Sequence, residues 1–85
     1  MKELAKIIKK IKSESEIEAF LNELLTESEL NTLSKRWCIL NMLNNGCTQR
    51  SIASELKVSL CKVTRGAKII KDKDSIIRKY LIKEK

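Results

Sequence analysis

Thr48 to Ile70, with the sequence TQRSIASELKVSLCKVTRGAKII, contains two short helical patterns separated by one tight turn. In the first pattern Ile52, Ala53 and Leu56 fall on one face of a 3.6-residue period, and Thr48 is placed to cap the free N–H groups before them. Ala53 is a small residue at the point where the two helices of such a motif approach closely. This half predicts a helix of about two turns.

The second pattern repeats this arrangement, with Ser59 as the predicted N-cap. Its predicted buried stripe consists of Leu60, Val63 and Ala67. Lys57 and Val58 form the turn, and Val58 is expected to fill the space between the helices. The whole stretch is therefore predicted to be a helix-turn-helix. Its polar face carries Gln49, Arg50, Lys62, Thr64, Arg65 and Lys68.

The composition of the 85-residue chain favours helices, because it has no proline, two glycines and abundant Leu, Ile, Lys and Glu. A single chain of this length buries only a modest fraction of its surface, so we expect one all-α domain that forms a homodimer. The longest apolar run falls far short of the roughly 18 residues that span a bilayer, and no secretory signal opens the chain. We therefore expect a cytoplasmic protein with no membrane partner.

The net charge of +7 is distributed unevenly along the chain. Residues 1–12 carry +4, residues 13–34 carry −6 and residues 35–85 carry +9. The acidic charge is thus kept away from the predicted helix-turn-helix, whose half of the chain is attracted to polyphosphate. This distribution predicts double-stranded DNA as the partner.

The segments that flank the helix-turn-helix are predicted to complete a single domain over residues 1–85. Residues 1–12 form a basic amphipathic helix, for which packing on a partner protomer is favoured and a membrane-surface or nucleic-acid arm stays open. Residues 13–47 are predicted to hold two dimerisation helices, started by capping boxes at Ser13 and Thr26. Residues 71–85 are predicted to hold a closing helix. The total is six helices.

Three further expectations concern the ends and faces of these helices. The helix after Thr26 is expected to run for about 18 residues and to stop at Gly46, which can take the left-handed conformation. Trp37 lies on its apolar stripe and is expected to belong to the core. Asp74 is the expected N-cap of the closing helix.

The chain has three cysteines, Cys38, Cys47 and Cys61, and no histidine. This set lacks the spacing and the partners of a zinc site, so no metal is expected, and the thiols are expected to stay reduced. A redox role stays open only for Cys61, near the start of a helix. Without histidine, a glycine-rich phosphate loop or a pair of catalytic carboxylates, the sequence does not suit an enzyme.

From Leu24 to about Leu81 the chain resembles the Trp repressor superfamily, and it is most similar to the shorter YerC/YecD branch. The resemblance rests on LLTESELNTLSKRWCILNMLNNGCTQRSIA, residues 24–53, and on Val63-Thr64-Arg65-Gly66. It implies an intertwined all-helical dimer whose two helix-turn-helix units reach successive major grooves. It also implies a role as a transcriptional repressor.

The resemblance further implies roles for single residues in DNA binding. Arg50 would read a guanine, which suits a guanidinium fork facing O6 and N7. Gln49 and Lys57 would lie near phosphates, and lysines generally suit such backbone contacts. Leu60, Cys61 and Thr64 would approach base edges. The full predicted DNA-binding set is Gln49, Arg50, Lys57, Ser59, Leu60, Cys61, Lys62, Thr64 and Lys68.

In the tryptophan-binding members of this superfamily, an amino acid wedges beneath the recognition helix, with its indole between two arginines. Arg65 and Gly66 match part of that pattern. The second arginine would align with Lys35, or with Arg36 if one residue is deleted before the helix-turn-helix. The candidate ligand pocket therefore comprises Thr26, Lys35, Arg36, Arg65, Gly66 and Ile69.

Two positions in this chain depart from the tryptophan-binding pattern, since Lys62 and Ile69 stand where small polar residues normally border the ligand. An apolar side chain where an ammonium or indole N–H should bond leaves that group unpaired, at a cost of roughly 1–3 kcal/mol. We expect that tryptophan does not bind tightly. No cofactor is expected, and another small-molecule effector stays open.

Together these observations favour a homodimeric, sequence-specific DNA-binding transcriptional regulator, expected to be a repressor that acts on a roughly palindromic operator. The alternative is a module that binds a protein or a membrane surface through the basic N-terminal helix.

Overall fold

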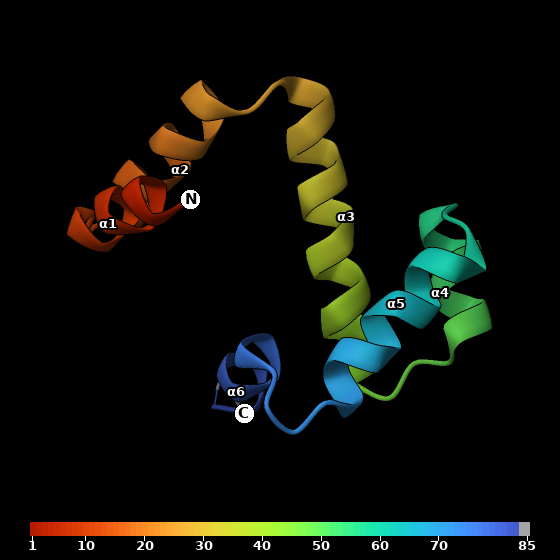
Figure 1. The fold of residues 1–85 in the computed structure, drawn as a ribbon. Helices are drawn as coiled ribbons and strands as arrows, with labels where there is room; N and C mark the ends of the chain where they lie inside the picture. The colour runs from red at the N-terminus through yellow and green to blue at the C-terminus, as the bar shows by residue number, and fades with distance from the viewer. Residues whose placement is uncertain (84–85) are drawn as a thin grey trace. The chain divides into compact units, whose positions relative to one another are not determined.

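The described part of the chain folds into six helices joined by short connections (Figure 1). The structure, a computed structural model, describes residues 1–83 and the side chains of residues 1–81. Over these residues the predicted all-α, six-helix fold is confirmed. None of the described helices is both long enough and apolar enough to cross a membrane. The helices are α1 (Lys2–Lys10), α2 (Glu14–Leu24), α3 (Glu27–Asn44), α4 (Gln49–Leu56), α5 (Leu60–Lys71) and α6 (Ile76–Lys83).

Hydroxyl caps start α2 and α3 where the sequence predicts them. The Ser13 Oγ accepts a hydrogen bond of 3.1 Å from the Glu16 N–H. Before α3 the capping box is complete, because Thr26 Oγ1 accepts from the Glu29 N–H at 3.2 Å and Glu29 Oε1 accepts from the Thr26 N–H at 2.9 Å. These bonds satisfy N–H groups that a helix start otherwise leaves free.

The 18-residue helix α3 ends in a Schellman motif centred on Gly46. Gly46 has a φ of +90°, in the left-handed region that suits glycine. Its N–H donates to the Leu43 carbonyl at 3.1 Å, and the Cys47 N–H donates to the Met42 carbonyl at 3.0 Å. The last carbonyls of α3 are thereby satisfied, and the chain leaves the helix towards α4.

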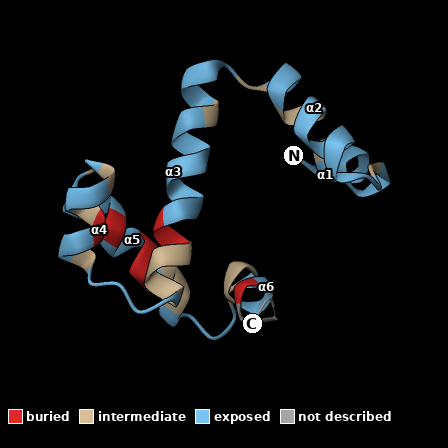
Figure 2. Cartoon of the chain, turned by 180° about the vertical axis from the view of Figure 1, so that it is seen from behind, coloured by how far each residue is buried: buried red, intermediate tan, exposed pale blue. Residues whose placement is uncertain are grey.

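The chain divides into two compact units, residues 1–32 and residues 33–85. In the first unit, neither α1 nor α2 contains a buried residue (Figure 2). Ile7 and Ile8 of α1 are 46% and 41% exposed, although their spacing gives the helix a distinct apolar face. An apolar face without a cover is costly in water. The first unit therefore offers apolar surface for contact with another molecule.

The second unit has a small core, made where α3, α4 and α5 meet. Ile39 of α3, Ile52 of α4 and Val63 of α5 are at most 3% exposed. Helix α5 also packs on α6, whose Leu81 is 1% exposed. The partly buried residues packed against the centre are Met42, Leu43, Ala53, Leu56 and Val58, so Val58 fills the turn as the sequence predicts.

Helix α5 packs tightly against α3 at Gly66, which is buried in the middle of α5. A Cβ atom at this position would lie 2.9 Å from Cγ2 of Ile39 and 3.2 Å from Cδ1 of Leu43. The Ile39 methyl group is attached to a branched Cβ inside the core, so it has little freedom to move away. Glycine thus sets the distance between the two helices.

Two apolar residues are more exposed than the sequence analysis expected. Leu60, placed in the buried stripe, is 48% exposed, because it is the first residue of α5 and precedes the part of the helix that faces the core. Trp37, expected in the core, is 43% exposed. The buried residues of α3 are Ile39 and Leu40, so none of the residues before them in this helix belongs to the core.

The predicted cap of the closing helix is also wrong. Helix α6 begins at Ile76, so the residue placed to cap it is Ser75, whose Oγ accepts from the Arg78 N–H at 3.2 Å. Asp74 instead belongs to the preceding turn, where its N–H donates to Asp72 Oδ1 at 2.9 Å. Two adjacent cap-forming residues made this boundary ambiguous in the sequence.

We predict that Gly66→Ala lowers the free energy of unfolding by up to about 2 kcal/mol. The added methyl group overpacks the core by about 1–3 kcal/mol, which outweighs the gain of about 1 kcal/mol in helix propensity. Lys68→Ala, at an exposed position of the same helix, should change stability by less than about 0.5 kcal/mol. Chemical denaturation followed by circular dichroism measures both, and an alanine variant more stable than the parent would contradict the close contact.

Candidate nucleic-acid interface and ligand pocket

The predicted helix-turn-helix is present as α4, a three-residue connection and α5. Thr48 Oγ1 accepts from the Ser51 N–H at 3.2 Å, and Ser59 Oγ accepts from the Lys62 N–H at 3.4 Å, so both predicted caps are confirmed. Each cap fixes the start of its helix. Ile52 of α4 and Val63 of α5 hold the two helices on the shared core.

Lys57 closes α4 in the left-handed conformation, with φ 54° and ψ 46°. It is the only non-glycine residue with positive φ in the described chain. This geometry lets the Val58 N–H donate to the Ala53 carbonyl at 3.1 Å and turns the chain sharply into α5. A side chain in this conformation costs roughly 1–2 kcal/mol, and nothing in the sequence indicated it, because glycine is the usual residue here.

A hydrogen-bonded side-chain pair joins the start of α4 to α5. The Thr64 hydroxyl lies 3.1 Å from Oε1 of Gln49 and 3.0 Å from the Leu60 carbonyl oxygen, and its one proton serves one acceptor at a time. The partners of this pair are 15 residues apart, so periodicity within either helix did not reveal the bond. The pair holds two residues of the predicted DNA-binding set against each other.

The structure leaves the predicted DNA-binding residues accessible. Gln49 is half-buried, and the other eight members of the set are exposed. The exposure of Leu60, which makes it a poor core residue, suits contact with an outside partner. Four cationic side chains of this set, those of Arg50, Lys57, Lys62 and Lys68, therefore reach solvent, and Arg65 of the same motif is exposed as well.

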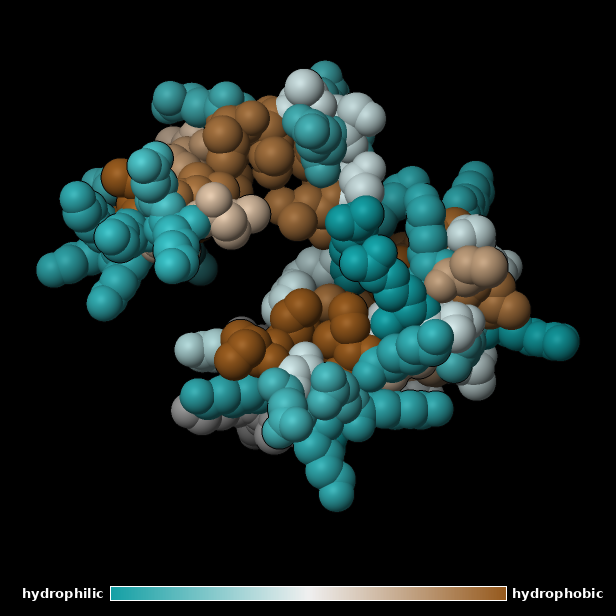
Figure 3. All heavy atoms as spheres, in the orientation of Figure 1, coloured by the Kyte–Doolittle hydropathy of each residue, from teal (hydrophilic) through white to brown (hydrophobic). Residues whose placement is uncertain are grey.

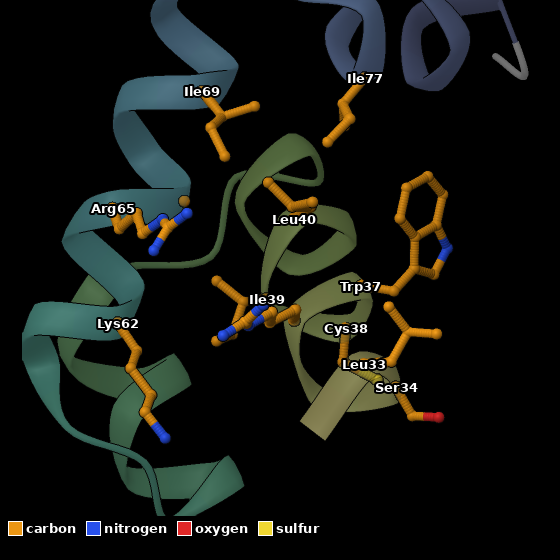
Figure 4. Close-up of a pocket in the computed structure, with 12 residues that line it drawn as sticks. Leu33, Ser34, Trp37, Cys38, Ile39, Leu40, Lys62, Arg65, Ile69 and Ile77 are labelled. Atoms are coloured by element: carbon orange, nitrogen blue, oxygen red, sulfur yellow. The ribbon is translucent and has the colours of Figure 1, made fainter. Parts of the chain in front are cut away.

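A second feature of this unit is a cavity of about 880 Å³ beside α5 (Figure 4). Among the candidate pocket residues, it brings together Arg36, Arg65, Gly66 and Ile69. Lys35 and Thr26 are not among its lining residues, and Thr26 serves in the cap of α3 instead. The other lining residues are Leu33, Ser34, Trp37, Cys38, Ile39, Leu40, Lys62 and Ile77. The exposed Trp37 therefore lines a cavity, a role that its position on the apolar stripe did not predict.

The fold and these two sites agree with what comparison with known proteins shows. A family model described as Trp repressor protein matches residues 1–85. The chain belongs to the Trp repressor family. This family is regulatory and not enzymatic, so the expectation of a non-enzymatic chain is confirmed.

Individual relatives support the same assignment. A Trp operon repressor homolog of Xylella fastidiosa (strain M23) is 39% identical over 82 residues, which cover 95% of this chain and 87% of the relative. A Trp operon repressor homolog of Chlamydia trachomatis serovar D is 35% identical over 77 residues, or 85% of this chain and 82% of the relative. No solved structure matches the chain significantly. The chain is a regulator of the Trp repressor type.

The three cysteines are all free and exposed. Among the described residues, no group of three metal-ligating side chains is placed to hold an ion. Cys61 follows Leu60 at the start of α5, and Cys38 lines the cavity, so the two thiols belong to different sites.

We predict that Lys57→Gly leaves the free energy of unfolding unchanged or raises it by up to about 1 kcal/mol. Glycine takes the left-handed conformation without strain, which stabilises the folded state. Part of that gain is lost because glycine also gives the unfolded chain more conformational freedom. Lys57→Val should destabilise, because a β-branched residue fits positive φ poorly. Denaturant titration of the two variants measures this difference, and equal stabilities would show that the turn does not hold this conformation.

Proposed function

We propose that this chain is a homodimeric, sequence-specific DNA-binding repressor that contacts DNA through α4 and α5. The observation that carries the proposal is the accessible cationic surface of the helix-turn-helix, in a chain of the Trp repressor family. Arg50 reads a guanine in the major groove. Gln49 and Lys57 lie near phosphates and set the register, while Leu60, Cys61 and Thr64 approach the base edges. Ser59, Lys62 and Lys68 complete the proposed contact set.

The small core of the single chain supports the proposed homodimer. Six apolar side chains are buried in the described residues, and exposed apolar groups lie on both units (Figure 3). A protein with so little buried surface gains much of its stability from a partner. We assign residues 13–47 to the dimer contacts and residues 48–70 to DNA. The exposed apolar residues include Ile17, Leu24, Leu33, Trp37, Ile76 and Tyr80.

A symmetric dimer implies a symmetric operator. Two recognition helices related by a two-fold axis reach successive major grooves when they are about 34 Å apart, which is one turn of the duplex. The operator is then roughly palindromic, with two half-sites. Such a regulator works in the compartment that holds the DNA, which agrees with the expected cytoplasmic location.

The proposed repressor does not use tryptophan as a strong corepressor. Arg36 and Arg65 both line the cavity and would suit the carboxylate and the ring of such a ligand. Ile69 and Lys62 line it as well, and neither side chain can accept a hydrogen bond from an ammonium group. The cation of Lys62 also repels a second positive charge.

The first test concerns DNA recognition and needs an operator selected from random duplexes at one fixed salt concentration. We predict that Arg50→Ala costs about 1–3 kcal/mol on the selected operator and relaxes the preference for one guanine. Lys57→Gln should weaken binding to all duplexes alike. It should also reduce the slope of log K against log salt by about 0.9 for each phosphate that the variant no longer neutralises.

The control for this test is Lys73→Gln, which removes an exposed charge outside the helix-turn-helix and should leave the base preference unchanged. Titrations by fluorescence anisotropy give both the affinities and the salt slopes. Binding that does not depend on salt, or an Arg50→Ala variant that weakens every duplex equally, would refute the assigned roles.

The second test concerns the N-terminal helix, for which we propose packing of its isoleucine face on the partner protomer. Deletion of residues 1–12 should abolish the dimer in sedimentation experiments at micromolar concentration. Replacing Lys6 and Lys9 by Gln, which preserves the isoleucine face, should leave the dimer intact. A deletion variant that stays dimeric but no longer binds anionic vesicles would favour the membrane-surface function instead.

A further inference from the structure

We propose that Thr64 acts on DNA through Gln49, by holding the Gln49 amide so that its NH₂ group faces the duplex. Thr64 is then a positioning residue, and its hydroxyl proton is used inside the protein instead of on a base. The inference rests on the proposed function, because it concerns how one contact of the helix-turn-helix is prepared before DNA binds. Its basis is the hydrogen bond that joins α4 to α5.

The amide of Gln49 has an acceptor end and a donor end, and only the acceptor end is engaged within the protein. The Thr64 hydroxyl donates to Oε1 of Gln49 at 3.1 Å. Within the described chain, Nε2 of Gln49 has no protein partner. A primary amide carries two donors on its nitrogen and its acceptor on the oxygen. Holding the oxygen therefore leaves both donors for an outside partner.

The Thr64 hydroxyl has two acceptors in reach, and its choice decides which end of Gln49 is offered to DNA. The Leu60 carbonyl oxygen lies 3.0 Å from Oγ1 of Thr64, and it also serves the helical bond of α5. If the proton went to Leu60, Oγ1 would become an acceptor and the Gln49 amide could turn its nitrogen inward. A phosphate oxygen accepts and cannot donate, so phosphate contact favours the bond to Gln49.

Gln49 also stands where a donor suits a phosphate. It is the first residue of α4, and the Thr48 cap serves the N–H of Ser51. The backbone N–H groups of Gln49 and Arg50 therefore lack helical partners. Free N–H groups at a helix start favour an anion, and an amide that presents its NH₂ group adds donors beside them. An amide turned the other way would present an oxygen to the phosphate.

The bond orders a long side chain before DNA arrives. Gln49 and Thr64 lie 15 residues apart, on two helices that share one core. Thr64 is β-branched, so Oγ1 has few positions in a helix, and its place relative to Gln49 is defined. Immobilising a flexible side chain costs affinity, and a side chain that is already held avoids part of that cost. Loss of the hydroxyl should therefore weaken DNA binding.

The test uses two variants that separate the hydroxyl of Thr64 from its shape. Thr64→Val keeps the shape and loses the hydroxyl, whereas Thr64→Ser keeps the hydroxyl. Thr64 is exposed, so both variants should fold, which thermal unfolding checks. In anisotropy titrations with the selected operator, Thr64→Val should bind about fivefold more weakly, and Thr64→Ser should stay within about twofold of the parent.

A double-mutant cycle shows whether Thr64 acts through Gln49. In a Gln49→Ala background, Thr64→Val should cause no further loss of affinity, because the amide that Thr64 holds is gone. Thr64→Val should also leave the base preference unchanged, since a phosphate contact carries no sequence information. Additive losses, or a changed base preference in Thr64→Val, would show that the hydroxyl contacts DNA directly and would overturn the proposal.

A measurement without DNA separates this proposal from the proposed function. Nuclear magnetic relaxation of the Gln49 NH₂ group should show a restricted amide in the free protein, a mobile one in Thr64→Val and a restricted one in Thr64→Ser. Equal mobility in all three proteins would overturn the positioning role and leave the repressor standing. A restricted amide in a protein that binds no duplex would overturn the proposed function, and with it the use of this amide on DNA.

Discussion

The close approach of α5 to α3 at Gly66 is the contact on which the rest of the second unit depends. It is set by the 2.9 Å between an added Cβ and the Ile39 methyl group, which leaves no room for a side chain. Val63 lies one turn earlier in α5 and is fully buried. The contact at Gly66 and the burial of Val63 together fix the rotation of α5 about its own axis. The rotation in turn decides that Thr64 and Lys68 reach solvent. The face of α5 that we propose contacts DNA is therefore determined by a core contact on another face of the same helix.

The two units differ in how far a single chain can stabilise them. In the second unit, three helices share a core in which Ile52 and Val63 are fully buried. In the first unit, α1 and α2 have clear apolar faces but bury nothing, and only α2 has a side-chain cap at its start. Capping and propensity alone give only marginal stability to helices of this length. In the proposed homodimer, the first unit is the part for which a second copy matters most, and the concentration of the protein would then govern its order.

Local signals in the sequence predicted the helix boundaries well, because a cap or a Schellman motif involves residues within a few positions of each other, as at Thr26 and Gly46. Burial was predicted less well, since it depends on which segment covers a face. Trp37 and Leu60 fit apolar stripes, yet they are 43% and 48% exposed. The basic residue of α3 that lines the pocket could likewise be identified only from the structure. The sequence left Lys35 and Arg36 as alternatives, and only Arg36 lines the cavity.

The two proposed sites share one helix, and this arrangement gives a physical basis for regulation. Lys62 and Arg65 line the cavity, while Thr64, between them in sequence, bonds to Gln49 on the side of α4. A ligand can shift the DNA affinity only if it binds better to one placement of α5 than to another. The close contact at Gly66 allows α5 only a few distinct positions against α3. A small displacement would open a gap that the packed core cannot fill. A change at Lys62 and Arg65 would therefore act on the orientation of the whole of α5, and the Gln49–Thr64 bond would carry that change to α4.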